Sequence, residues 1–199
     1  MAESEFSIPI AYFDMNKNSK EFKRKLETDK DFHEASSSCF DSADSFLRFA
    51  SYPFLLGNIE DAFSTAAFTN ASFSCELFLK SILLAQCEKP GNIHKLDKLF
   101  GKLSADTQDS IIDSFPLGEG THTRDRDEFM LQLHEIRDAF PIIRYCYEMT
   151  SYSFHYEYVL NLALSLREEA RSQLSKIDYE KSDVIITAPI QLRGPHNDN

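Results

Sequence analysis

Apolar residues recur every three or four positions through most of the chain, a spacing typical of amphipathic α-helices. The clearest stripe includes Phe78 and Ile82, and it predicts a long helix over Asn58–Glu88. A second stripe, which includes Leu133, predicts another long helix over Asp127–Tyr147. We expect these two helices to form the centre of the hydrophobic core.

Shorter apolar stripes predict further helices at Asp31–Tyr52, His94–Leu103, Asp106–Phe115 and Phe154–Lys176. Pro53 and Gly57 are expected to end the first of these, and Pro141 to kink the helix over Asp127–Tyr147, because proline has no backbone N–H to donate. Glycine (6 copies) and proline (7 copies) are scarce among the 199 residues, which leaves room for long helices. The sequence therefore predicts an all-α bundle of about five helices.

The helical pattern divides the chain into three parts. Residues 1–25 form an N-terminal extension with a short apolar run and a charged run, residues 26–178 form one helical domain, and residues 179–199 form a C-terminal tail. Within the tail, the segment Val184–Leu192 has the composition of a strand but no obvious partner strand, so we expect an extension.

Net charge and cysteine usage narrow the choice of compartment and partner. The formal net charge of −11 repels RNA or a nucleotide unless a local patch reverses the sign, so it disfavours either as a ligand without excluding it. The four cysteines form no C-x-x-C pair and are expected to be buried free thiols. No basic signal sequence and no apolar run of about 20 residues is present, so we expect a cytoplasmic protein without membrane association.

The common metal and cofactor motifs are absent from the sequence. It contains no H-E-x-x-H, no C-x-x-C, no EF-hand loop, no glycine-rich phosphate loop and no G-x-S-x-G. We therefore expect no metal ion and no cofactor.

Histidine and arginine side chains gather on one side of the predicted helix over Asp127–Tyr147. On a helical wheel, His134, Arg137 and Arg144 share one side, together with Pro141 and Glu148. Two arginines can bind a phosphate through paired hydrogen bonds, and a histidine can transfer a proton. The alternative is a half-solvated helix edge on which Arg144 and Glu148 form a simple ion pair.

Three segments together resemble the HEPN superfamily of small helical domains. They are ASFSCELFLKSILLAQ, in which Glu76 and Lys80 lie one turn apart, HKLDKLF, which begins at His94, and Arg137-Asp138 followed by AFPIIRYCYE. The resemblance covers roughly residues 30–176. It implies an α-helical fold that commonly dimerises. Many members of the superfamily are metal-independent ribonucleases of toxin–antitoxin, abortive-infection or other antiviral systems.

The ribonuclease motif of that superfamily is an arginine, usually a polar residue next, and a histidine after four to six intervening residues. The histidine handles a proton of the RNA and the arginine stabilises the charge of the phosphate. Arg137 and Asp138 match the start of this motif, but positions 142, 143 and 144 are Ile, Ile and Arg. The acid–base group of the family is therefore missing from its place.

Two other histidines can replace the missing group if the site has been rebuilt. They are His134, one turn before Arg137, and His155, at the start of the last predicted helix. The remaining positions that resemble the family also have purely structural interpretations. Glu76 and Lys80 can form a simple i,i+4 pair, and His94 can cap a helix.

Three functions remain open from the sequence. The first is a non-catalytic HEPN-like interaction or scaffold protein, a homodimer with a protein partner in a prokaryotic antiviral defence, toxin–antitoxin or stress system. The second is a metal-independent endoribonuclease that uses Arg137, His134, Arg144 and His155. The third is a helical adaptor unrelated to that superfamily.

Overall fold

A computed structural model describes residues 25–55, 57, 65–116, 125–143 and 156–177, and within these ranges the protein is helical with no β-strand. The predicted all-α fold class is confirmed. The C-terminal tail and residues 1–24 of the N-terminal extension lie outside the described residues. The described helices are α1 (Asp29–Leu55), α3 (Thr65–Ala85), α4 (Leu96–Phe100), α5 (Ala105–Ser114), α6 (Arg126–Glu135), α7 (Ala139–Ile143) and α8 (Tyr156–Lys176).

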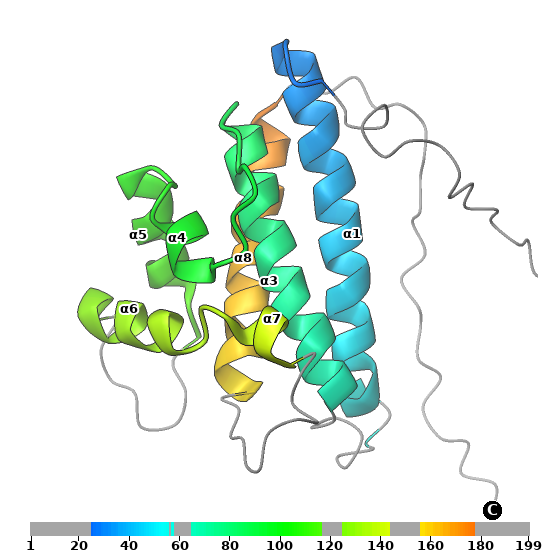
Figure 1. Ribbon diagram of the computed structural model, residues 1–199, viewed down its shortest axis with the longest axis vertical. Helices are drawn as coiled ribbons and strands as arrows, with labels where there is room; N and C mark the ends of the chain where they lie inside the picture. The colour runs from blue at the N-terminus through cyan, green and yellow to red at the C-terminus, as the bar shows by residue number, and fades with distance from the viewer. Residues whose placement is uncertain (1–24, 56, 58–64, 117–124, 144–155, 178–199) are drawn as a thin grey trace, which may run out of the picture.

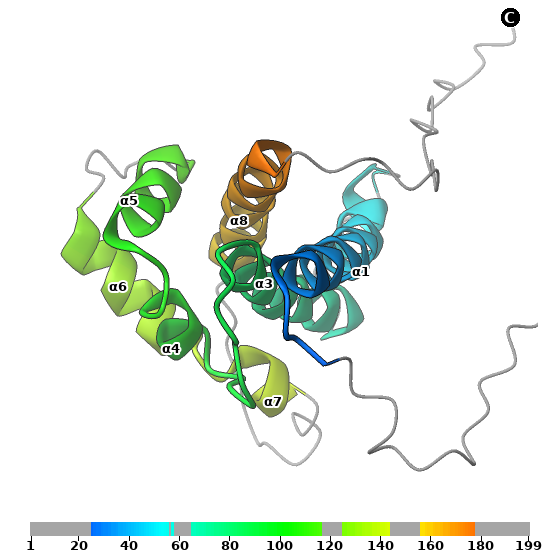
Figure 2. The ribbon, with the colours of Figure 1, turned by 90° about the horizontal axis from the view of Figure 1, so that it is seen from above.

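Helix α3 is the central element of the bundle. It lies between α1 and α8, while α4, α5 and α6 form a second group beside this layer and α7 crosses the lower half of α3 (Figures 1 and 2). From Ala67 to Ala85 no residue of α3 is exposed. The helix is therefore covered on every side, and this explains why its buried set is wider than the single stripe predicted from the sequence. The buried apolar residues of α3 are Ala67, Phe68, Ala71, Cys75, Phe78, Leu79, Ile82, Leu83 and Leu84.

A buried carboxylate connects the two outer helices of this layer. Asp44 of α1 accepts hydrogen bonds from Arg167 of α8 at 2.5 Å and from Arg48, one turn further along α1, at 2.7 Å. Aromatic contacts hold the second group of helices to α8. There the Phe129 ring packs against Phe100, Phe115 and Tyr158, and the Tyr158 hydroxyl donates to the Phe129 carbonyl at 3.1 Å.

The prediction of one long helix over Asp127–Tyr147 is wrong. The chain leaves helical geometry at Ile136, and α6 and α7 are separate elements. Proline explains the break, because Pro141 has no N–H to donate to the carbonyl of Arg137 four residues earlier. That carbonyl instead accepts a hydrogen bond from the backbone N–H of Leu96 at 3.1 Å, so the break ties α4 to the α6–α7 junction.

Other element ends differ by a few residues from the prediction. Helix α1 continues through Pro53 to Leu55, three residues beyond the predicted end at Tyr52. Helix α3 ends at Ala85, and Cys87 has a left-handed backbone (φ 57°) from which its N–H reaches the Leu84 carbonyl at 3.0 Å. Cys87 is exposed, so the prediction of buried thiols is wrong for this residue. The predicted helix start at Asn58 lies outside the described residues.

No helix among the described residues has the length and apolar character needed to cross a lipid bilayer.

We predict that Asp44→Asn lowers the free energy of unfolding by about 2 kcal/mol, because it leaves Arg167 without its charged acceptor at the α1–α8 contact. Urea denaturation followed by circular dichroism measures the change. Asp41→Asn, on the exposed side of the same helix, is the matched control and is expected to change the stability by less than about 0.5 kcal/mol. Equal effects of the two substitutions would contradict a structural role for the Asp44 contact.

Candidate functional site

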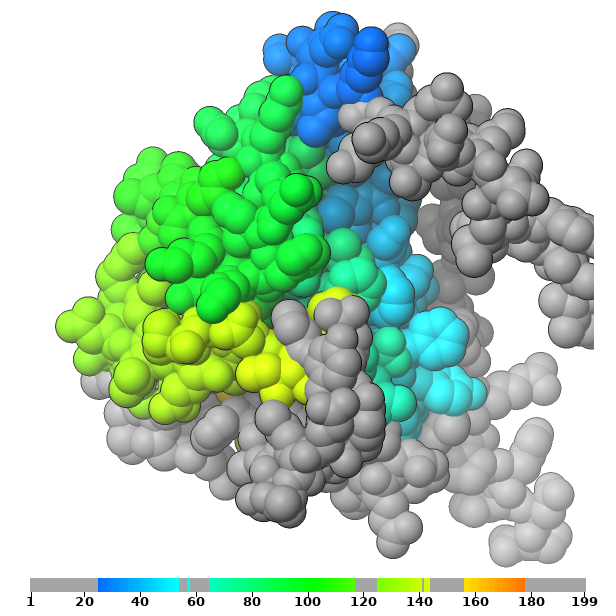
Figure 3. Space-filling model, in the orientation of Figure 1, coloured from blue at the N-terminus to red at the C-terminus, as the bar shows by residue number. Residues whose placement is uncertain are grey.

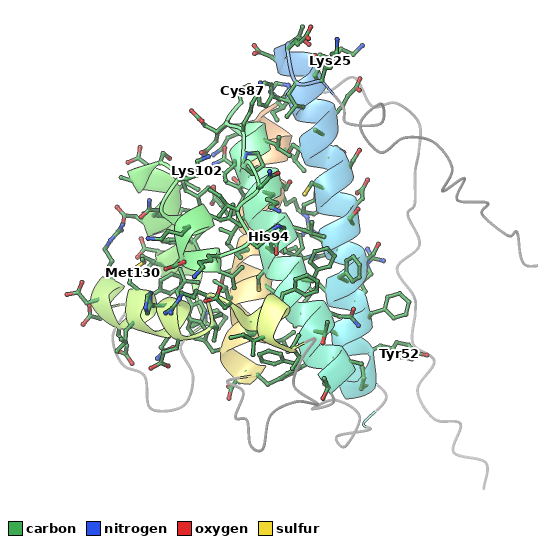
Figure 4. All side chains as sticks on the ribbon, viewed as in Figure 1. Lys25, Tyr52, Cys87, His94, Lys102 and Met130 are labelled. Carbon is green, nitrogen blue, oxygen red and sulfur yellow. The ribbon has the colours of Figure 1, made fainter. Side chains whose placement is uncertain are left out.

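A buried carboxylate of α3 binds a lysine and a histidine side chain. Glu76 is 1% exposed, and its Oε1 accepts from Lys80 Nζ at 2.6 Å and lies 2.9 Å from Nδ1 of His94. Lys80 is largely buried, whereas the His94 side chain is 60% exposed at the surface in front of α3 (Figure 4). The segment before α4 is therefore fixed to the core helix through one carboxylate oxygen.

The second oxygen of Glu76, Oε2, is buried and accepts no hydrogen bond from the described residues. The charge of this carboxylate is thus balanced through Oε1 alone, which makes Lys80 and His94 important for its burial. The thiol of Cys39 on α1 lies in the same electrostatic environment and donates to the Leu77 carbonyl at 3.2 Å. Burial raises the pKa of Cys39 to about 11, with Lys80 opposing and Glu76 adding to the increase, so it is a neutral thiol at pH 7.

A second carboxylate–histidine pair lies on the other side of α4. Asp97 of α4 places Oδ2 3.2 Å from Nδ1 of His134 on α6. The carboxylate is 11% exposed and its Oδ1 is buried without a hydrogen bond from a described residue, whereas the imidazole is 58% exposed. A carboxylate at Nδ1 favours the tautomer that carries its hydrogen there and leaves Nε2 to accept a proton.

Arg137 lies one turn after His134, where the chain leaves α6. Its Nη1 donates to the His134 carbonyl at 3.0 Å, and its Nε lies 3.2 Å from Oδ2 of Asp138. Lys95 Nζ reaches the same Asp138 oxygen at 3.4 Å. The guanidinium is therefore held close to His134 but is already bound to a carboxylate.

Together these contacts form one polar site around α4, which we call the α4 site and define by the residues that make them. The acids are Glu76, Asp97 and Asp138, and the cationic or basic partners are Lys80, His94, Lys95, His134 and Arg137. The acids face the protein and the two histidines face the solvent. Such an arrangement can transfer protons and can bind an anion.

Several of these residues lie next to the neighbours that the sequence pattern predicts. His134 and Arg137 are neighbours, although the helical-wheel argument assumed a continuous helix that is broken between them. Glu76 and Lys80 form the predicted i,i+4 pair. His94 does not cap a helix, because Lys95 occupies the N-cap position of α4.

Other predicted site residues are not brought into this cluster. Arg144 and His155 lie outside the described residues, as does Glu148, so their places stay predictions. At the positions where the family motif requires histidine, Ile142 is exposed at the surface of α7 and Ile143 is buried in the core.

The sequence reasoning missed Asp97 as a functional residue. The only available signal was a carboxylate three residues after His94 in the segment HKLDKLF. Its partner His134 lies 37 positions further along the chain. Within the described part of the chain no group of three or more His, Cys, Asp or Glu side chains is arranged to hold a metal ion.

Comparison with known proteins finds no matching family model, no similar curated protein and no similar solved structure. The resemblance to the HEPN superfamily therefore stays a prediction.

We predict that Glu76→Gln destabilises the protein by about 2 kcal/mol, because the ammonium of Lys80 then loses its charged partner in a largely buried position. Urea denaturation measures the effect. The double variant Glu76→Leu/Lys80→Leu is expected to recover a large part of the loss, since it removes both charges from the interior.

The control for this experiment is Glu168→Gln, which breaks the contacts of the exposed Glu168 carboxylate with Arg167 and Arg171. We expect a change below about 0.5 kcal/mol there. A Glu76→Gln variant as stable as this control would show that the buried pair does not hold the α4 site in place.

Proposed function

We propose that this protein is a non-catalytic HEPN-like helical interaction protein. It forms a homodimer and binds a protein partner in a prokaryotic antiviral defence, toxin–antitoxin or stress system. The observation that carries the proposal is the pair Ile142 and Ile143 on α7, where the family motif requires the acid–base histidine. An isoleucine can neither donate nor accept a proton, so the usual chemistry of the motif is absent at these positions.

The contacts of Arg137 also support a binding role. Its guanidinium is charge-compensated by Asp138, which also binds Lys95. An arginine that stabilises the transition state of phosphate transfer has to direct its donors at the reacting group. In this protein Nε of Arg137 contacts the Asp138 carboxylate and Nη1 donates to the His134 carbonyl, so two of its nitrogens are directed at the protein's own groups.

The first test is a ribonuclease assay of the purified full chain with total RNA and tRNA in EDTA. We expect no cleavage above that of a buffer control, because the motif has lost its acid–base group. Cleavage that Arg137→Ala or His134→Ala abolishes would overturn the non-catalytic assignment.

A second candidate function is a metal-independent endoribonuclease, favoured by the Asp97–His134 pair beside Arg137. In such a site Nε2 of His134 would take the proton of a 2′-hydroxyl while Asp97 holds the imidazole and Arg137 binds the phosphate. If cleavage is found, Asp97→Asn is expected to lower the rate by about tenfold to a hundredfold, as a positioning residue does. His33→Ala, on α1, is the matched histidine control and is expected to leave the rate unchanged.

Exposed aromatic side chains on α1 offer a surface for the homodimer. Phe49 is 72% exposed and Tyr52, three residues further along, is also exposed. We expect light scattering at micromolar concentration to give twice the monomer mass of 22.8 kDa. Phe49→Glu is expected to weaken the dimer by at least about tenfold, because aromatic anchors supply much of the binding energy of an interface.

Leu131→Glu, which alters an exposed apolar residue of α6, is the control for this measurement. A wild-type protein that stays at 22.8 kDa would count against the homodimer.

A further inference from the structure

We propose that a basic surface around α4 binds an acidic segment of the protein partner. The surface consists of Lys89, His94, Lys95, Lys98 and Lys102 and is called the α4 basic surface below. The inference rests on the proposed function and specifies the chemistry of the partner.

The local charge of this segment is opposite to that of the whole chain. Residues 89–102 contain four lysines and one carboxylate, while the complete chain has a net charge of −11. The single carboxylate, Asp97, is 11% exposed and faces His134. All four lysines and His94 are exposed, so the outward surface of this segment is cationic.

Contacts fix the positions of three of these side chains. Lys102 Nζ donates to the Lys89 carbonyl at 2.6 Å, which closes the loop before α4 onto the turn after it. His94 is tied to Glu76, Lys95 to Asp138, and the Leu96 N–H to the Arg137 carbonyl. A surface held in this way loses little conformational freedom when a partner binds.

The surface lies on one face of the molecule. Residues 89–102 occupy the middle of the view in Figure 3, and His94 and Lys102 both lie on that face in Figure 4. No described carboxylate is paired with Lys89 or Lys98; the ammonium of Lys89 lies 5.9 Å from the centre of the Phe32 ring. These two lysines are therefore available to carboxylates from outside.

The observations favour an acidic protein segment over a nucleic acid. A phosphate backbone extends well beyond four lysines and would meet the negative charge of the rest of the protein. Helix α6, which packs against α4, carries the exposed carboxylates of Glu128 and Glu135. Leu131 on the same helix is an exposed apolar residue (61%), and the peptide probe therefore includes leucine.

The test measures binding of fluorescent probes to the full chain by anisotropy. The main probe is a peptide of about 16 residues, rich in Glu and Asp with Leu at every fourth position, and its control has Gln in place of every acid. A single-stranded RNA of similar length is the third probe. We expect the acidic peptide to bind, the Gln peptide to bind at least about tenfold more weakly, and the affinity to fall with salt.

Matched charge reversals locate the binding surface. Lys95→Glu/Lys98→Glu is expected to weaken binding of the acidic peptide by at least about tenfold. Arg171→Glu/Lys176→Glu changes the net charge by the same amount at the exposed end of α8 and is expected to change it by less than about twofold. Lys89→Glu/Lys98→Glu, which keeps both the Lys95–Asp138 contact and the bond from Lys102 to the backbone carbonyl of residue 89, guards against a folding defect of the first variant and is expected to weaken binding as well.

Each other outcome overturns the proposal in a distinct way. Equal losses in the surface and control variants would mean that binding follows net charge alone. Tight binding of RNA with weak binding of the peptide would assign the surface to a nucleic acid. No binding of either probe would reject this surface, while the ribonuclease assay and light scattering test the proposed function independently.

Discussion

The burial of α3 on every side, from Ala67 to its end, is the constraint on which the rest of the molecule depends. A helix covered on every side needs neighbours in all directions, and α1, α8, α4 and α7 supply them. The same burial determines the chemistry near Glu76, because a carboxylate inside such a helix must be paired. Lys80 comes from the same helix, but His94 has to come from the segment before α4. The packing of the core and the assembly of the α4 site thus have one cause.

Much of this fold follows from the spacing of apolar residues. The helices now seen as α1, α3, α5 and α8 were all expected from their stripes, because long periodic segments identify helices well. The helix break at Ile136 was not, since apolar periodicity continues across it through Leu133 and Ile143. Pro141 signalled a disturbance, but whether proline kinks a helix or ends it depends on tertiary contacts. Here another segment, through Leu96, uses the carbonyl that proline cannot satisfy.

In the candidate site, too, contacts between residues close in the sequence could be predicted, whereas contacts between distant segments could not. The Glu76–Lys80 pair is local and could be predicted from a four-residue spacing. The contact of Asp97 with His134 joins two helices whose relative position depends on tertiary packing. No motif in the sequence predicts it. Sequence reasoning found the histidine and the arginine of the site. It could not find the acid that orients the histidine.

The hydrogen bond from Leu96 to Arg137 joins backbone atoms only, so it does not depend on the side chain at either position. Pro141 leaves this carbonyl to Leu96, because proline brings no N–H of its own. A substitution of Arg137 can therefore change the charge and the hydrogen-bond donors of the α4 site while α4 stays attached to the α6–α7 junction.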